Sequence, residues 1–207
     1  MKNGIKANKL SFLLHYQYAE HEEENAHALE VRTTLESLIN NIGQEYEKMN
    51  KMAEFMKMQI DLEAEADTNM PSEGQENEQQ VKLIRQKDRQ ARKELIDQQH
   101  QARIDNIGND ATNAWIALMH STRRMEGIKA ARQIFAKARK SKPLSHHIFI
   151  ASAMMEFHCN DDKAIASKVF ELGLKSYHDK VDYVLRYLNF LIQINDEPSM
   201  SSSKRMS

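Results

Sequence analysis

Large aromatic residues recur at a fixed interval through the second half of the chain. Trp115, Phe149 and Tyr183 follow one another at intervals of 34 residues. A second set of positions recurs one helical turn further on, at Met119, Ala153 and Tyr187. A period of this length, opened by a large aromatic residue and without a strand pattern, is typical of helix-pair repeats.

Between these aromatic positions lies a second recurring pattern, shifted by 35 residues. Its members are Ala131, Arg132, Ile134, Phe135 and Ala138, which correspond to Ala166, Ser167, Val169, Phe170 and Gly173. In residues 114–124 and 127–139 the apolar residues fall on one face at helical spacing. Each unit is therefore predicted to be an antiparallel helix pair, and the small residues beside Phe135 would let the partner helix approach closely.

One helix pair cannot bury its own apolar face, so stacked pairs would close a continuous core. We predict an all-α protein in which HAT-like or TPR-like helix pairs form a short α-solenoid. An ordinary helical bundle with chance matches is the alternative. The residues expected to form the repeat core are Trp115, Met119, Ile134, Phe135, Phe149, Glu156, Phe170, Tyr183 and Tyr187.

The repeats divide the chain into four predicted segments. Residues 8–40 are expected to form a weaker helix pair, because Arg32 and Leu35 have the same separation as Arg132 and Phe135. Residues 41–110 are expected to be an insertion. Residues 111–195 would hold two complete repeats and the first helix of a third, and residues 196–207 a disordered tail. Such an ending would leave an apolar face uncovered, so we expect either an interface there or a partial or truncated chain.

The predicted insertion carries charge of opposite sign in its two halves. Residues 61–78 hold seven acidic and no basic residues, whereas residues 79–103 hold seven Lys or Arg against three acids. The run Met70-Pro71-Ser72-Glu73-Gly74 would break a helix between them. The segment is therefore predicted to form two polar helical arms around a flexible tip, or to be largely disordered. Attraction between the arms would be weak and sensitive to salt, and the insertion could separate the first helix pair from the others.

Composition excludes several classes of protein. The net charge of −1 points to neither nucleic acid nor membrane, and no apolar run approaches the length of a membrane span. The N-terminus lacks the features of a signal peptide. The single cysteine, Cys159, excludes an internal disulfide and fits a reducing compartment.

Histidines offer little sign of a metal centre. His21 and His27 are six residues apart, whereas a helical zinc motif needs a spacing of four. The adjacent His146 and His147 are expected to diverge and to open a helix near residue 148, with Ser145 as its N-cap. His158 and Cys159 would supply only two ligands. We therefore predict no metal site.

Enzymatic signatures are missing as well. The glycines are scattered, so they form no phosphate-binding loop, and no serine lies in a nucleophile elbow. The chain is predicted not to be an enzyme and to need no cofactor.

A basic stripe covers residues 123–142, with eight basic residues and the single acid Glu126. Such a stripe can follow phosphates, although no exposed aromatic residues are expected to interleave with it for base stacking. It can equally be a solvated or protein-binding face. Arg132 recurs as Arg32, which favours a structural role for that residue. The candidate RNA or partner contacts are Arg123, Arg124, Lys129, Lys137, Arg139, Lys140 and Lys142.

The repeat pattern resembles the half-a-TPR (HAT) repeat of RNA-processing proteins. Three runs resemble the suppressor-of-forked family more closely: residues 13–24, LLHYQYAEHEEE; residues 123–140, RRMEGIKAARQIFAKARK; and residues 146–191, HHIFIASAMMEFHCNDDKAIASKVFELGLKSYHDKVDYVLRYLNFL. The likeness extends over about residues 10–40 and 111–196. The segment 41–110 stands where the family has a short connection, and neither it nor the tail resembles the family.

The resemblance implies a non-enzymatic nuclear scaffold in pre-mRNA 3′-end cleavage and polyadenylation. The family includes the scaffold subunit of cleavage stimulation factor, whose second half forms a homodimer. Implied partners are the other cleavage stimulation factor and polyadenylation subunits and a second copy of the chain. Contact with pre-mRNA would be mostly indirect, and no membrane contact is expected. The alternatives are a direct RNA binder that uses the basic stripe and a TPR-like peptide-binding module.

Overall fold

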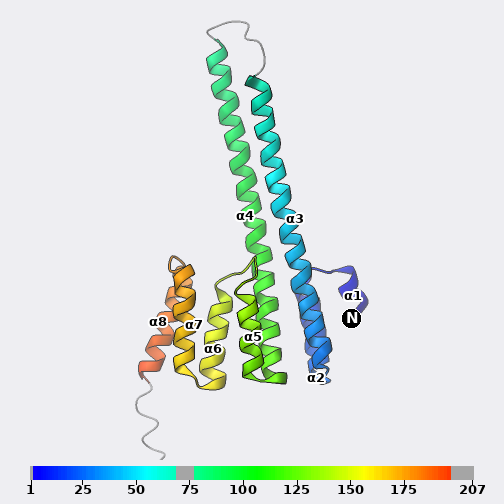
Figure 1. The fold of residues 1–207 in the computed structure, drawn as a ribbon, viewed down its shortest axis with the longest axis vertical. Helices are drawn as coiled ribbons and strands as arrows, with labels where there is room; N and C mark the ends of the chain where they lie inside the picture. The colour runs from blue at the N-terminus through cyan, green and yellow to red at the C-terminus, as the bar shows by residue number, and fades with distance from the viewer. Residues whose placement is uncertain (1, 69–76, 197–207) are drawn as a thin grey trace, which may run out of the picture.

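The computed structural model describes residues 2–68 and 77–196, and these residues contain helices and no strand (Figure 1). The helices are α1 (Lys2–Ala7), α2 (Phe12–Glu24), α3 (Ala28–Thr68), α4 (Asn77–Glu126), α5 (Ile128–Ala138), α6 (His147–Asn160), α7 (Lys163–Tyr177) and α8 (Val181–Asp196). The predicted tail falls almost wholly outside the described residues, because α8 includes residue 196 and the description ends there.

Helices α2 to α8 form a layered body. Helices α2 and α3, α4 and α5, and α6 and α7 pack as successive pairs, and α8 packs on α6 and α7 (Figure 1). Several helix starts carry local signals. Asp162 Oδ1 accepts the backbone N–H of Ile165 at 2.9 Å at the start of α7, and Gly127 takes the positive φ of 93° that joins α4 to α5. The predicted all-α array of helix pairs is confirmed.

Two of these helices also leave the body to form an arm. Helices α3 and α4 have 41 and 50 residues, which correspond to about 60 and 75 Å at 1.5 Å per residue. The borders predicted at 40/41 and 110/111 lie inside these uninterrupted helices, so the arm is an extension of repeat helices. The expectation that this segment could separate the first helix pair from the others is wrong, because α3 and α2 both pack on α4.

The two helices of the arm meet along a narrow seam and through charged side chains. Met49, Ala53 and Ile60 are buried on α3. The acidic and basic halves pair as predicted from their charge, with Arg92 Nη2 2.9 Å from Glu63 Oε2. Lys57 with Asp97 and Lys93 with Asp61 form further pairs. The Met-Pro-Ser-Glu-Gly run of the predicted tip lies outside the described residues.

Aromatic side chains hold successive layers of the body together. The rings of Phe135 and Phe149 lie 5.4 Å apart at 90°, and those of Phe170 and Tyr183 lie 6.0 Å apart. These two contacts join corresponding positions of consecutive repeats. Tyr183 also donates its hydroxyl hydrogen to the backbone oxygen of Phe170 at 2.8 Å in the buried core. The recurring aromatic residues therefore fill the same kind of gap between layers.

Gly173 makes this close packing possible. A Cβ atom at this position would lie 2.1 Å from the Tyr183 hydroxyl oxygen and 3.0 Å from Cγ of Phe149. The position corresponds to Ala138 in the preceding repeat, where a small residue was predicted. Only glycine at this position of α7 leaves room for the side chain of Tyr183 on α8.

Candidate interaction surfaces

The predicted repeat-core residues lie in the body between its layers. Met119, Ile134, Phe135, Phe149, Phe170, Tyr183 and Glu156 are buried. Trp115 and Tyr187 are partly buried and pack against the same core cluster. These residues position the helices and leave the outward faces for contacts with other molecules.

A buried carboxylate joins two consecutive pairs. Glu156 on α6 is 1% exposed and accepts two hydrogen bonds from Arg132 on α5, both at 2.8 Å. Asn160 Nδ2 donates to the same carboxylate at 3.1 Å. The hydrogen bond to Glu156 raises the pKa of the Arg132 guanidinium. In the earlier layer, Arg32 Nη2 contacts Glu126 Oε1 at 2.5 Å and so joins α3 to the end of α4.

The basic stripe is not one continuous surface. Arg123 donates to the backbone oxygen of Cys159 at 3.0 Å, and Arg124 forms a two-point contact with Glu23 on α2. Arg124 holds the pKa of the Glu23 carboxyl below its usual value. These two arginines therefore fasten helices to each other. The remaining candidates, Lys129, Lys137, Arg139, Lys140 and Lys142, are all exposed, and Arg124 is exposed as well although it contacts Glu23.

The direction of α5 spreads the exposed members over both ends of the body. Lys129 lies near the start of α5, away from the arm, whereas Lys137 and the connection after α5 lie on the side from which the arm rises (Figure 1). An 11-residue helix spans about 16 Å, so the two groups are well separated.

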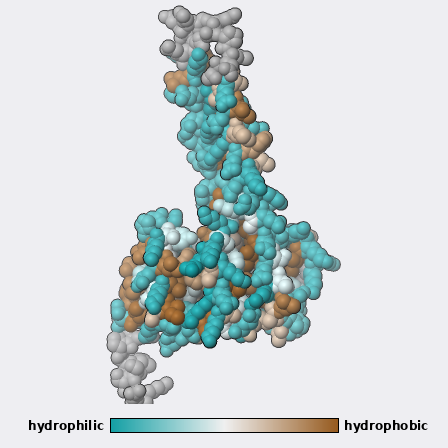
Figure 2. All heavy atoms as spheres, viewed as in Figure 1, coloured by the Kyte–Doolittle hydropathy of each residue, from teal (hydrophilic) through white to brown (hydrophobic). Residues whose placement is uncertain are grey.

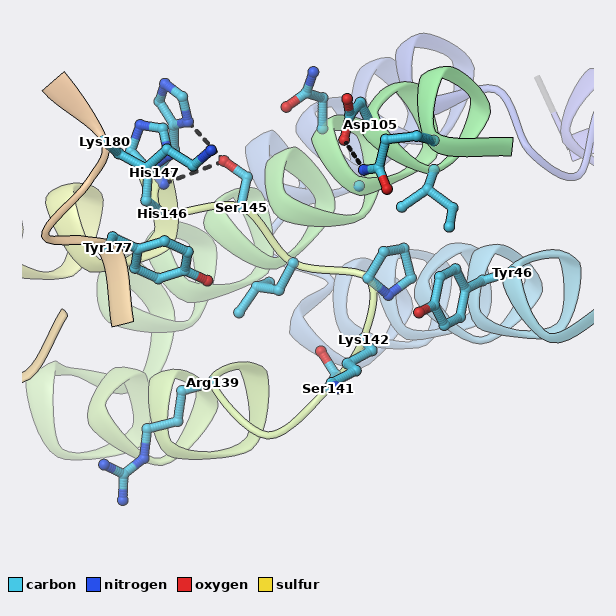
Figure 3. A pocket seen from close by; sticks show the side chains of 16 residues that line it. Tyr46, Asp105, Arg139, Ser141, Lys142, Ser145, His146, His147, Tyr177 and Lys180 are labelled. Atoms are coloured by element: carbon cyan, nitrogen blue, oxygen red, sulfur yellow. Dashed lines mark hydrogen bonds between the residues drawn. The ribbon is translucent and has the colours of Figure 1, made fainter. Parts of the chain in front are cut away.

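A cavity of about 580 Å³ lies beside the connection between α5 and α6. Its lining contains Arg139, Lys142 and Lys180, with Asp105 as the acidic member. Figure 3 shows Tyr46 and Tyr177 on opposite sides of the connection. The cavity has the chemistry to hold an anionic group. It could not be predicted from the sequence, because its lining comes from segments that lie far apart along the chain.

His146 and His147 do not diverge, contrary to expectation. Their ring centroids lie 4.1 Å apart at 31°, beside Ser145 (Figure 3). Helix α6 begins at His147, with His146 at the N-cap position and Ser145 one residue earlier, so Ser145 is not the N-cap. The Cα–Cβ bonds of a helix tilt toward its N-terminus, so the first side chains extend beyond the first turn. No preceding turn of helix lies there to separate the two imidazole rings. Burial and His146 lower the pKa of His147.

Two rows of apolar side chains face solvent. On α8 the row is Val181, Leu185, Leu188 and Ile192, at helical spacing, and each is about half or more exposed. On the arm the row is Met52, Phe55, Met58 and Leu62. Figure 2 shows hydrophobic side chains on the outer edge of the arm and at the α8 end of the body. Exposed apolar patches of this kind mark interaction surfaces. Sequence reasoning anticipated the α8 row as an uncovered face and missed the row on the arm.

Stacked helix pairs with buried aromatic wedges define a helical-repeat protein of the α-solenoid class. Within residues 2–68 and 77–196, no helix combines the length and the apolar composition that a membrane crossing requires. The chain belongs to the suppressor of forked (Suf) family, since the profile of that family matches residues 1–202.

Relatives in several organisms support this assignment. The chain is 38% identical over 199 residues to the mRNA 3′-end-processing protein rna14 of Schizosaccharomyces pombe, covering 95% of this chain and 23% of the relative. It is 34% identical over 211 residues to RNA14 of Cryptococcus neoformans, covering 95% and 19%. The protein suppressor of forked of Drosophila melanogaster is 44% identical over 88 residues, or 42% of this chain and 12% of the relative. The chain spans about a fifth of the length of the fungal relatives.

These matches correct the extent of the resemblance. A match covering 95% of the chain must include most of residues 41–110. The arm is therefore shared with the fungal relatives and does not replace a short connection there. The charged, repeat-free composition of this segment hid the likeness.

Proposed function

We propose that this chain is a non-enzymatic scaffold segment of the mRNA 3′-end-processing machinery and acts in the nucleus through protein contacts. Membership of the Suf family and the names of the relatives support a role in mRNA 3′-end processing. The observation that carries the scaffold role is the pair of exposed apolar rows, on α8 and on the arm. Helical repeats present such rows over long distances, which suits the assembly of several proteins.

The α8 row supplies the test of this proposal. Leu185 and Leu188 are 53% and 48% exposed, so replacing both by serine should remove contact area while leaving the buried core intact. The purified chain would be added in excess to a nuclear extract that cleaves and polyadenylates a synthetic pre-mRNA. We expect the wild-type chain to co-precipitate subunits of the processing machinery and to lower cleavage by competition. The L185S/L188S variant should lose both effects.

An exposed lysine outside the apolar rows provides the matched control. The Lys168→Gln variant should compete as well as the wild-type chain, because Lys168 is exposed on α7 and lies outside both apolar rows and the basic stripe. A wild-type chain that neither captures those subunits nor alters cleavage would contradict the proposal. So would equal competition by the L185S/L188S variant.

A homodimer belongs to the same proposal, with the α8 row as the surface that a second copy would cover. Light scattering should then give a mass about twice the 24.0 kDa of one chain. A mass of one chain at every protein concentration would remove the homodimer from the proposal.

Direct RNA binding is the second candidate, favoured by the cavity lined with Arg139, Lys142 and Lys180. Phosphate contacts release counterions, so binding of a labelled pre-mRNA would weaken steeply between about 50 and 200 mM salt. Replacing Arg139 and Lys142 by glutamine would then reduce the slope. The scaffold proposal expects no binding with this salt dependence.

A further inference from the structure

Three potential metal ligands meet where the starts of α6 and α8 come together. His146 Nε2 lies 3.3 Å and His147 Nε2 lies 3.8 Å from Oδ2 of Asp182, and one ligand atom from each residue falls within 4.8 Å of the others. Ligand atoms about 2.0–2.1 Å from a tetrahedral zinc ion are about 3.3 Å apart. The three side chains therefore need only small rotations to surround one ion.

Neighbouring groups hold two of these ligands in the required orientation. Ser145 Oγ lies 2.7 Å from His147 Nδ1, so the tautomer with hydrogen on Nδ1 donates to serine and leaves the Nε2 lone pair facing Asp182. Arg186 Nε lies 3.8 Å from Oδ1 of Asp182, which leaves Oδ2 for the histidines. Metal-binding sites commonly fix their ligands by such outer contacts.

The third ligand is fixed by packing. The side chain of His146 is 15% exposed, and its ring lies 5.8 Å from that of Tyr177 and 6.0 Å from that of Tyr183. These aromatic rings restrict the imidazole to a narrow range of orientations. The lone pair of His147 Nε2 and the carboxylate oxygen both accept, so a cation between them would satisfy both.

We propose that His146, His147 and Asp182 form a binding site for one divalent transition-metal ion of the zinc type. Two imidazoles and a carboxylate suit Zn²⁺, and the fourth position is left for water or for a donor from a partner. The ion would fasten the first turn of α8 to the start of α6. Arg186, the two helix N-termini and Lys180, which lines the same cavity as both histidines, place positive charge nearby, so the affinity should be lower than that of a closed four-ligand zinc site.

Calorimetric titration of the tag-free chain with Zn²⁺ at neutral pH tests this site. We expect one equivalent to bind in the wild-type chain and to raise its melting temperature. The Asp182→Asn and His147→Gln variants should each bind at least about 10-fold more weakly, and Ser145→Ala about 10-fold more weakly through the lost outer contact. Asp182 and His147 are exposed, so both variants should keep the helical circular dichroism of the wild type.

His158→Gln is the matched control, because His158 is exposed at the other end of α6 and lies next to Cys159. Its zinc affinity should equal that of the wild type. Long-range ¹H–¹⁵N spectra of the wild-type chain give a second measurement that needs no variant. Zinc should shift the Nε2 signals of His146 and His147.

Any of three results would overturn the site. One is the lack of saturable zinc binding by the wild-type chain. Another is binding that persists in both Asp182→Asn and His147→Gln. The third is zinc-induced shifts confined to other histidines such as His27, which contacts Glu22.

Discussion

The body and the arm share two helices but are held together by different forces. In the body, side chains such as Phe170, Tyr183 and Phe190 are at most 1% exposed and contact one another between layers. In the arm, Phe55 is 49% exposed and the contacts are a narrow seam and solvent-facing ion pairs. Because α3 and α4 run through both regions, the difference lies in the side chains and not in the type of backbone structure. Matched substitutions in the two regions should therefore have very different costs.

The largest contrast is expected for phenylalanine. Phe170→Ala should lower the free energy of unfolding by about 3–5 kcal/mol, because it empties a fully buried site. Phe55→Ala in the arm should change it by no more than about 0.5 kcal/mol. Urea denaturation followed by circular dichroism measures both. Similar losses for the two variants would show that the arm is packed as tightly as the body.

Ion pairs should show the next contrast. Arg132→Met leaves the buried Glu156 carboxylate without its main partner, which should cost about 2–4 kcal/mol when the partial exposure of the arginine is taken into account. Arg92→Met breaks an exposed pair with Glu63 and should cost about 0–1 kcal/mol. Thermal melts at two salt concentrations distinguish them, since only the arm pair should be strongly screened. Equal costs would argue against a special role for Glu156.

Two helical glycines should respond to alanine with opposite sign. Gly173→Ala places a Cβ atom against Tyr183, so a loss of about 1–3 kcal/mol is expected. At Gly43 on α3 no heavy atom lies within 4 Å of the added Cβ, so Gly43→Ala should gain up to about 1 kcal/mol from helix propensity. Adding Tyr183→Phe should relieve part of the Gly173→Ala loss. A neutral Gly173→Ala variant would mean that Tyr183 can move aside.

The smallest expected effect is on the loss of stability at acidic pH. Burial, with Arg124 and Arg123 nearby, holds the pKa of His120 below its ordinary value of 6.5, so the unfolded chain binds this proton more readily. The contribution to stability is fully present above pH 6.5 and is lost as the pH falls below it. His120→Gln should reduce the drop in melting temperature between pH 7 and about pH 5. An unchanged pH profile would assign that drop to other groups.

The sequence predicted the body better than the arm for a physical reason. Trp115, Phe149 and Tyr183 recur because each layer needs a large side chain at the same place, and that need is visible as a period. The arm is not built from layers, so it requires no large side chain at a regular interval. Its seam uses few apolar residues, such as Met49 and Ile60, so the polar sequence fitted helix and disorder equally well.

The candidate sites were even harder to predict from the sequence than the arm. Asp182 lies 35 residues beyond His147, and only the stacking of α8 on α6 brings them together. The cavity likewise combines Tyr46 on α3 with Tyr177 on α7. The basic stripe could be recognised from the composition of residues 123–142. Which of its side chains contact other helices could not, because that depends on where Glu23 and Cys159 lie in space.

Helix α4 makes the arm and the central layer a single lever. It has no break between Asn77 and Glu126, and the segment that carries Trp115 is part of the same rod as the outer arm. A molecule that pulled the far end sideways would turn the rod about the body, and the long outer portion would multiply a small force into torque on the layer. A molecule that binds the arm is thus mechanically connected to the central layer through α4, without contacting that layer.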